Sequence, residues 1–496
     1  MLFSSSNSST TLESQAKYFA LNKEDPSERD RNSSTLEDWT DAEGQRGKKV
    51  PRTCRNYTRW RDNARDSSRE KSEPVPARVN ILKYDTPQEN FRLNLRDDSR
   101  YVTGFPHGGL TNQLMSMFKL VHIGERLDRD VILPDLEADH GEGDHARYSD
   151  FFDLDYFSAQ SGVALAEWRD VTTTIDHTTS TEQAQLGCWG HSKWYSAPLE
   201  RYNTHTTFWP FPEALQNKWI SYKERSISFA GIEVLNHDDN REWIDAQIAA
   251  GFGSVDNVTP SPPLPPPDQQ LLCFQNLYYI TDVKFSKGEV DRSDSIEELD
   301  PNGPVWKVGQ YLRFSPRVDG LVDDILGSLL GDVHQPFIAI HIRQGEFSIR
   351  DGSFATRADG KERGEGIGDF VKYSWTSSDT TKIKEAYSRG LEELRTKLAA
   401  LPIMQDYDVQ RLPILLATDS TDLVLLEELN QLRWKLIDHG KLETEKKYGG
   451  WYPGLLDSAI LSRAVGLVGT QQSTFTYLAK RRIETWNGGT SIVVRV

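Results

Sequence analysis

The last third of the chain alternates short, mostly apolar runs with segments of helical periodicity, and this alternation constrains the fold more than any other feature. The apolar runs lie at 336–343, 412–419 and 466–469, and the helical patterns at 318–330, 379–401, 423–432, 455–464 and 473–482. A strand that is apolar on both faces needs cover on both faces, as in a parallel sheet between two layers of helices. We therefore expect an α/β, Rossmann-like domain over residues 311–496.

A strand–helix–strand pattern near residue 100 predicts another Rossmann-like domain over residues 79–310. A strand at 100–103 is followed by a glycine turn, a helix at 114–127 and a buried strand at 131–134. This order is typical of the βαβ unit that opens a doubly wound sheet. Residues 150–300 are rich in aromatic side chains but have no regular period, so we interpret them as long loops inserted into this domain.

Composition limits the partners and the compartment. Residues 1–78 are dominated by Ser, Asp, Glu, Arg and Lys, which predicts a disordered tail or stem. The net charge of −16 would repel a nucleic acid, so we expect no such partner. No apolar run reaches the ~18 residues that span a bilayer, and residues 1–10 lack a secretory signal pattern, so membrane association is not supported. Cys188 and Cys273 could form a disulfide, or they and Cys54 could all stay reduced.

We expect the ligand site at the carboxyl ends of the C-terminal strands, where open α/β sheets bind ligands. Those ends carry His341 and Arg343, then Asp419, and finally Ser473 and Thr474 at the start of the last predicted helix. An arginine fork and the free amide groups of a helix N-terminus both bind phosphate. The combination predicts a phosphate site at Arg343, Ser473 and Thr474, beside which Asp419 could accept a hydrogen bond from a base or ribose.

Each of these residues also has a structural alternative. Ser473 could serve only as the helix N-cap, and Asp419 could cap the next helix or hold Arg343 in place instead of contacting a ligand. His341 could be a hydrogen-bonded core residue, and Arg343 could belong to a structural ion pair. The convergence of these groups at three neighbouring strand ends favours the ligand interpretation.

A glycine loop, GGLTNQ at 108–113, joins the first strand of the N-terminal domain to its helix. Its spacing matches neither the GxGxxG of dinucleotide sites nor the GKS/T of a P-loop. Asn112 and Gln113 open the helix and could merely cap it. The DxD triplet at 153–155 lies within an aromatic segment, FFDLDYF, that we interpret as structural, so a metal site is not expected.

The chain resembles the GDP-fucose protein O-fucosyltransferase family at several blocks of sequence that stand in the family's order. These blocks are GGLTNQ at 108–113, HIRQGEF at 341–347, ATDS at 417–420, and Asp457 followed by STFTYLAKRR at 473–482. There are two departures. Glu346 stands where the family usually has Asp, and the chain shows no signal for the secretory pathway, where family members generally reside.

The resemblance implies two Rossmann-like domains that face each other across a cleft (GT-B-like) and an inverting transfer that needs no metal or other cofactor. Arg343 would bind the β-phosphate and stabilise the departing GDP, with Asn112 beside it from the other domain. Asp419 and Asp457 would contact ribose or guanine. The other donor-binding groups would be His341, which helps to hold the nucleotide, the backbone of Gly108 and Gly109, which lines the cleft, and Ser473, Thr474 and Phe475, which bind phosphate and flank the base.

The function implied by the resemblance is transfer of fucose from GDP-fucose to a Ser or Thr hydroxyl of a protein, in the secretory pathway. A glycan acceptor is an alternative, because α1,6-type fucosyltransferases share the H-x-R strand end. A non-catalytic module that binds GDP-sugars is another alternative, and only Glu346 favours it.

Overall fold

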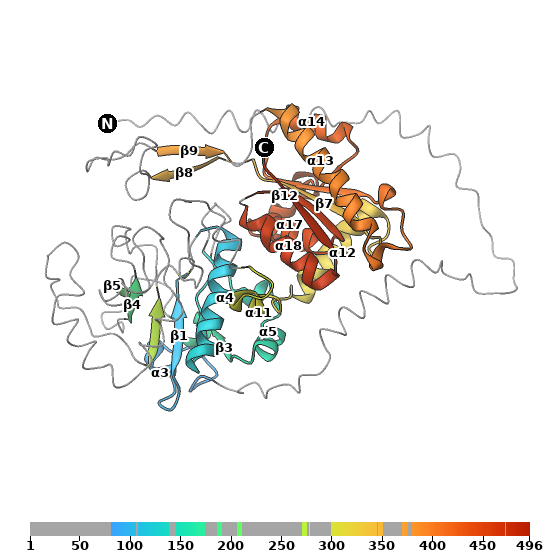
Figure 1. Cartoon of the computed structure of the whole chain (residues 1–496). Helices are drawn as coiled ribbons and strands as arrows, with labels where there is room; N and C mark the ends of the chain where they lie inside the picture. The colour runs from blue at the N-terminus through green and yellow to red at the C-terminus, as the bar shows by residue number, and fades with distance from the viewer. Residues whose placement is uncertain are drawn as a thin grey trace, which may run out of the picture.

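The structure is a computed structural model in which two parallel sheets are layered with helices (Figure 1). It describes residues 81–105, 108–137, 145–173, 186–190, 206–210, 270–274, 277, 299–344, 346–350, 370–374, 379–471 and 473–496. The predicted tail at 1–78 and much of the predicted loop region at 150–300 lie outside the described residues. The predicted α/β class, with a separate sheet in each half of the chain, is confirmed.

A five-stranded sheet forms the C-terminal half, with the order β11-β10-β7-β12-β13 and every neighbouring pair parallel. Its strands are β7 (Ile338–Ile342), β10 (Ile414–Thr418), β11 (Lys435–Leu436), β12 (Gly466–Thr470) and β13 (Thr490–Val494). The α-helices are α12 (Pro316–Leu330), α13 (Thr380–Ala399), α14 (Leu423–Gln431), α15 (His439–Leu442), α16 (Thr444–Tyr448), α17 (Tyr452–Ser462) and α18 (Thr474–Asn487), and short 3₁₀ turns occupy Pro402–Met404 and Val409–Arg411.

Different helices cover the two faces of this sheet, because the side chains of a strand alternate between its faces. Ile338, Ile340 and Ile342 of the central strand β7 belong to a core that includes side chains of α13 and α14. Ala339, between them, belongs to the core that includes side chains of α12, α17 and α18. His341 shares the face of Ala339, so β7 directs it toward α18.

A six-stranded parallel sheet forms the N-terminal half, with the order β3-β2-β1-β6-β4-β5. Cys188 of β4 and Cys273 of β6 form a disulfide, so the paired alternative for these cysteines holds. The strands are β1 (Tyr101–Gly104), β2 (Asp130–Leu133), β3 (Leu165–Glu167), β4 (Leu186–Gly190), β5 (Thr206–Pro210) and β6 (Leu271–Phe274). The helices are α3 (Phe91–Asn94), α4 (Leu110–Leu127), α5 (Leu154–Ser161), α6 (Trp168–Val171) and α11 (Pro304–Gly309), with a 3₁₀ turn at Tyr148–Asp150.

Helix α4 begins at Leu110, earlier than the helix predicted at 114–127, so the last four residues of GGLTNQ lie inside it. Gly108 has φ +76°, a left-handed conformation that costs glycine little, and Gly109 is the extended N-cap residue. The Gln113 side chain donates to the Gly108 carbonyl at 2.8 Å and to the Glu137 carbonyl at 2.7 Å. Gln113 is therefore a structural anchor of the loop and not a cap.

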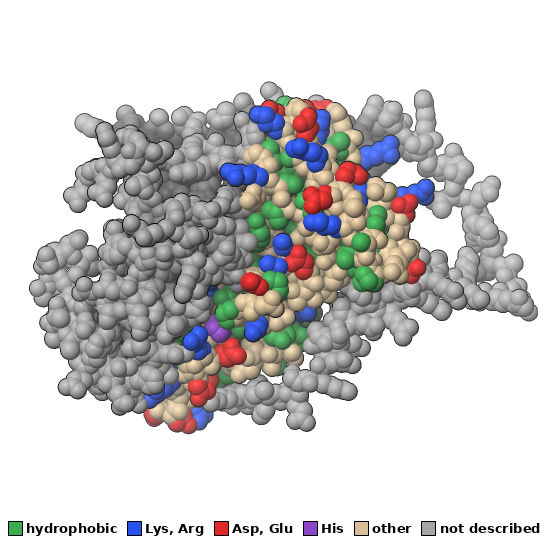
Figure 2. Space-filling model, viewed as in Figure 1, with side chains coloured by type: hydrophobic (Ala, Val, Ile, Leu, Met, Phe, Trp, Pro, Cys, Tyr) green, Lys and Arg blue, Asp and Glu red, His purple; other side chains and the backbone are tan. Residues whose placement is uncertain are grey.

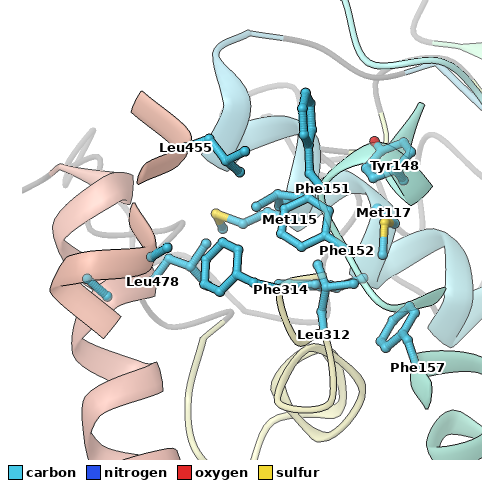
Figure 3. Packing of buried hydrophobic residues seen from close by; sticks show 14 of the residues in the cluster. Met115, Met117, Tyr148, Phe151, Phe152, Phe157, Leu312, Phe314, Leu455 and Leu478 are labelled. Atoms are coloured by element: carbon cyan, nitrogen blue, oxygen red, sulfur yellow. The ribbon is translucent and has the colours of Figure 1, made fainter. Parts of the chain in front are cut away.

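The two halves share one hydrophobic core. Met115 of α4 lies in the same buried cluster as Leu455 of α17 and Leu478 of α18 (Figure 3). The ring of Phe151 meets the ring of Tyr452 edge-on, with centroids 5.6 Å apart. These contacts fix the helix that carries the glycine loop against the C-terminal half.

Two antiparallel strands, β8 (Glu346–Arg350) and β9 (Phe370–Ser374), follow β7 and precede α13 in sequence, and they project away from the five-stranded sheet (Figure 1). On the described surface seen in Figure 2, acidic and basic side chains are interspersed. Within the described part of the chain, no helix has the length and hydropathy to cross a bilayer.

Candidate functional site

The carboxyl ends of β10, β7 and β12 lie side by side, as the sequence predicted. Ile342 stands opposite Thr418 of β10, and His341 stands opposite Gly469 of β12. The N–H group of Arg343, the residue that follows β7, donates to Oγ1 of Thr470 at 2.7 Å. The last residues of β10 and β12 and the residue that follows β7 therefore meet at one edge of the sheet, which we call the ligand edge.

Asp419 holds the guanidinium of Arg343 in place at this edge. Nη1 of Arg343 lies 2.9 Å from Oδ2 of Asp419, and Oδ1 accepts from the N–H of Gln344 at 2.8 Å. The exposed fractions of the Arg343 and Asp419 side chains are 35% and 28%, so solvent and small ligands reach both. Helix α14 is capped by Asp422, so the capping alternative for Asp419 is wrong. A guanidinium has several N–H donors, so the ion pair leaves some for a ligand.

His341 is buried and held uncharged beside α18. Its Nδ1 lies 2.7 Å from Oγ1 of Thr476, and its ring centroid lies 4.9 Å from that of Phe475. Burial lowers the pKa of His341 to about 4, and Arg343 adds to the lowering while Asp419 opposes it. At neutral pH the ring is therefore a neutral support between the sheet and the beginning of α18.

The amino-terminal end of α18 lies at the same edge. Ser473 is its N-cap residue, and the Ser473 hydroxyl accepts from the N–H of Thr476 at 3.4 Å. Ser473 is buried, so the capping role that the sequence left open is the one seen here. Thr474, which is only partly buried, begins the helix. The first N–H groups of a helix have no partner within the helix and carry partial positive charge, which suits an anion.

Asp457 of α17 is paired with His439, a residue that the sequence analysis did not single out. Nε2 of His439 lies 3.0 Å from Oδ1 of Asp457, and Nδ1 lies 3.0 Å from Oγ1 of Thr444. Burial raises the pKa of Asp457, His439 opposes this, and Asp419 adds to it, so the two carboxylates lie within electrostatic reach. Burial alone would lower the pKa of His439, but attraction to Asp457 raises it above its ordinary value.

In the N-terminal half, Asn112 lies in the first turn of α4. Its carbonyl accepts from the Ser116 hydroxyl at 2.9 Å, and its side-chain amide packs close to Gly108. Oδ1 of Asn112 and Oγ1 of the neighbouring Thr111 are buried without a hydrogen-bond partner among the described residues. No hydrogen bond or ion pair links Asn112 to Arg343 in the described part of the chain, so its place beside the donor stays a prediction.

The family model "GDP-fucose protein O-fucosyltransferase" matches residues 101–485, which is most of the chain. The chain belongs to the GDP-fucose protein O-fucosyltransferase family. Family membership makes it a GDP-fucose-dependent fucosyltransferase, and the two layered parallel sheets are the GT-B-like arrangement that the resemblance implied.

Solved structures of fucosyltransferases are similar to the chain at low identity. POFUT1 in complex with GDP is 14% identical with a TM-score of 0.44, over 81% of this chain and 100% of that one. POFUT1 in complex with GDP-fucose is 16% identical with a TM-score of 0.42, over 80% and 99%. NodZ from Bradyrhizobium is 12% identical with a TM-score of 0.34, over 77% and 93%. A sequence comparison with curated proteins finds no match, and the family assignment depends on the family model alone.

The first aspartate of the DxD triplet in this fucosyltransferase has a structural role. Asp153 is the N-cap residue of α5, and its carboxylate accepts from the N–H of Tyr156 at 3.0 Å. Among the described residues, no group of three or more His, Cys, Asp or Glu side chains could hold a metal ion.

Two further residues at the ligand edge of this family member were missed as site residues. Tyr387 lies on the apolar face of α13, within the helical pattern predicted at 379–401, and its hydroxyl lies 2.6 Å from Oγ1 of Thr470. Thr470 is the last residue of β12 and directly follows the apolar run predicted at 466–469. The only local signal is a hydroxyl on an otherwise apolar face, and sequence alone does not reveal its partner.

Proposed function

We propose that this fucosyltransferase transfers fucose from GDP-fucose to a Ser or Thr hydroxyl of a protein, with inversion at the anomeric carbon and without a metal ion. The observation that carries the proposal is the placement of Arg343, a partly exposed guanidinium, at the same sheet edge as the beginning of α18. Together they offer a fixed charge and free amide groups to a diphosphate.

In the proposed step, the acceptor oxygen attacks the anomeric carbon from the side opposite the diphosphate. The bond between that carbon and the β-phosphate oxygen breaks, and its electron pair stays on the phosphate. Arg343 and the first N–H groups of α18 stabilise the charge that grows there. Asn112 orients the acceptor hydroxyl. The proton of that hydroxyl leaves late, to water or to the departing phosphate, because the GGLTNQ loop has no carboxylate to accept it.

We assign the remaining residues to donor binding. His341 and Phe475 support the nucleotide, Asp419 and Asp457 face ribose or guanine, and Gly108, Gly109, Ser473 and Thr474 supply backbone or hydroxyl groups to the phosphates. In this proposal residues 311–496 bind the donor and residues 79–310 face the acceptor. The Cys188–Cys273 disulfide supports the secretory pathway as the compartment, because such bonds persist in oxidising surroundings.

Substitution of Arg343 tests the mechanism directly. We expect Arg343→Ala to lower kcat/KM for GDP-fucose by about 2–4 kcal/mol of transition-state stabilisation, because a fixed charge facing the leaving group is lost. The control is Arg411→Ala, which removes a guanidinium that is 88% exposed and pairs with Asp408 on a 3₁₀ turn. GDP release and fucosylated product are both measured. Unchanged turnover in Arg343→Ala would overturn the proposal.

The acceptor and the metal are tested with the same assay. We expect a fucosylated peptide by mass spectrometry when a library of folded protein acceptors is supplied, and equal rates with and without EDTA. Product on oligosaccharides only would identify a glycan acceptor, and GDP binding without transfer to either class would identify a binding module. Activity that EDTA abolishes and Mn²⁺ restores would contradict the metal-independent step.

A further inference from the structure

The peptide group between Ile342 and Arg343 is hydrogen-bonded at its carbonyl and at its N–H by threonine hydroxyls. Thr418, the last residue of β10, donates from Oγ1 to the Ile342 carbonyl at 2.8 Å. Thr470, the last residue of β12, accepts at Oγ1 from the N–H of Arg343 at 2.7 Å. Side chains thus replace the backbone partners that flanking strands would otherwise provide for this peptide. The orientation of the peptide sets the direction in which the Arg343 side chain leaves the sheet.

Tyr387 of α13 completes this arrangement from one face of the sheet. Its hydroxyl lies 2.6 Å from Oγ1 of Thr470 and 3.2 Å from the carbonyl oxygen of His341. Oγ1 of Thr470 lies 3.2 Å from the same carbonyl. If Tyr387 donates to Thr470, Thr470 donates to the His341 carbonyl, and if Thr470 donates to Tyr387, Tyr387 donates to that carbonyl. In both cases Oγ1 of Thr470 still accepts from the N–H of Arg343. Every donor in this network therefore has an acceptor within the fold.

Burial makes this network rigid. Thr470 is 1% exposed and Tyr387 is fully buried, so water does not compete for these bonds. A buried backbone N–H that loses its acceptor is strongly disfavoured, and the chain relieves this by moving. Because both hydroxyls are buried and hydrogen-bonded within the fold, we do not expect either to contact a ligand.

We propose that Thr470, supported by Tyr387, is a positioning residue that aims Arg343 at the β-phosphate of the donor. This inference rests on the proposed function, in which Arg343 contacts that phosphate. It makes a selective prediction, because Thr470 accepts directly from the N–H of Arg343, whereas at His341 the network bonds only the backbone carbonyl and not the imidazole ring. Loss of the Thr470 hydroxyl should weaken ligands that carry a β-phosphate and spare those that do not.

The test measures dissociation constants for GDP and GMP by calorimetry on the full chain. Thr470→Val, which keeps the side-chain shape, should weaken GDP about 10-fold, the effect of one lost hydrogen bond, and change GMP less than about 2-fold. Thr470→Ser should restore GDP affinity, because it returns the hydroxyl. Tyr387→Phe should show a smaller effect in the same direction, because the N–H of Arg343 keeps Thr470 as its acceptor.

A double-substitution cycle separates this inference from the proposed function. If Thr470 acts through Arg343, adding Thr470→Val to Arg343→Ala should change GDP affinity little further. If Arg343→Ala weakens GDP but Thr470→Val alone does not, the positioning role is wrong and the proposed function stands. If Arg343→Ala leaves GDP affinity unchanged, both ideas fail. Equal weakening of GDP and GMP by Thr470→Val, without rescue by Thr470→Ser, would show a purely structural role.

Discussion

Thr418, Asp419 and Thr470 bond to backbone groups of β7 and of the two residues that follow it. A strand that ends at the edge of a sheet leaves polar backbone groups without neighbours, and these must be satisfied if they are buried. Here side chains from the flanking strands do so, and this fixes Arg343 and Gln344 before any ligand arrives. Preorganisation of this kind reduces the cost of ordering charged groups during catalysis.

At the same scale, His341 should make the folded state sensitive to acid. Its pKa is lowered to about 4 by burial, so the unfolded chain takes up a proton first as the pH falls below about 6.5. The contribution of the neutral ring is complete above that pH and is lost between about pH 6.5 and 4, by up to about 3 kcal/mol. Denaturant unfolding of wild type and His341→Asn at several pH values measures this.

The wild-type free energy of unfolding should fall more steeply with acid than that of His341→Asn, which cannot titrate. Arg343 and Asp419, the charged groups that act on the ring, are present in both proteins and cancel in the comparison. Parallel pH curves for the two proteins would show that His341 is protonated or exposed in the native state.

At the scale of elements, the sequence predicted the parts whose pattern reflects burial on both faces. The runs that became β7, β10 and β12 are nearly continuous in apolar residues. Arg343, Asp419 and Ser473 follow these strands at one edge of the sheet, as predicted, and their contact with a ligand stays a prediction. The antiparallel strands β8 and β9 and the strands β3–β6 and β13 were not predicted as elements. Most of these segments are short and interrupted by glycine or polar residues, and their strand conformation depends on neighbours that are distant in sequence.

The partners of the site residues were predictable only in part. The sequence allowed Asp419 to cap a helix, to pair with Arg343 or to contact a ligand. In the structure Asp419 pairs with Arg343. His439 and Tyr387 lie in segments whose local pattern is ordinary, and their importance arises from contacts across the fold. Hydrogen bonds between residues far apart in sequence leave no periodic trace.

Helix packing on the sheet makes a prediction at this scale about Gly390. A Cβ added there would lie 2.8 Å from Cγ1 of Val494 and 2.9 Å from Cγ1 of Val468, so α13 would have to move away from β12 and β13. We expect Gly390→Ala to destabilise the fold by about 1–3 kcal/mol, since overpacking outweighs the gain in helix propensity. Urea unfolding measures the change.

Gly320 of α12 provides the matched control. It is an exposed helical glycine, and an added Cβ would meet nothing within 4 Å. Gly320→Ala should therefore stabilise the fold by roughly 0.5–1 kcal/mol. If both variants are stabilised, α13 is not packed against the sheet as closely as described.

At the scale of the whole molecule, the two sheets are joined by a common core and not by a simple linker. Arg482 of α18 is fully buried and lies with its guanidinium 4.6 Å from the ring centroid of Phe314 and 5.1 Å from that of Trp486. The Trp306 indole donates to the Thr485 hydroxyl at 3.0 Å, which connects α11 with α18. Contacts of this kind should couple the unfolding of the two halves.

Truncation of Phe314 tests this coupling. Phe314→Ala removes a buried ring that packs against Phe152 from the N-terminal half, with centroids 5.5 Å apart. We expect a loss of about 3–5 kcal/mol and a single unfolding transition, in which amides of β1 and β12 lose protection together. Hydrogen exchange followed by mass spectrometry resolves the two strands. Early loss of protection in one half alone would show that the sheets unfold independently.

The chain departs from β7 at a point secured by the bond from Gln344 to Asp419, and it returns in α13, whose Tyr387 reaches back to that same strand end. Both ends of the stretch that carries β8 and β9 are thus held by bonds to residues outside it, one through Gln344 and the other through α13. Shortening or lengthening such a segment changes the entropy of closing the loop only slightly. Changes in length between Gln344 and Asp379 should therefore cost the fold little stability, because the bonds that hold β7 and α13 in place lie outside that stretch.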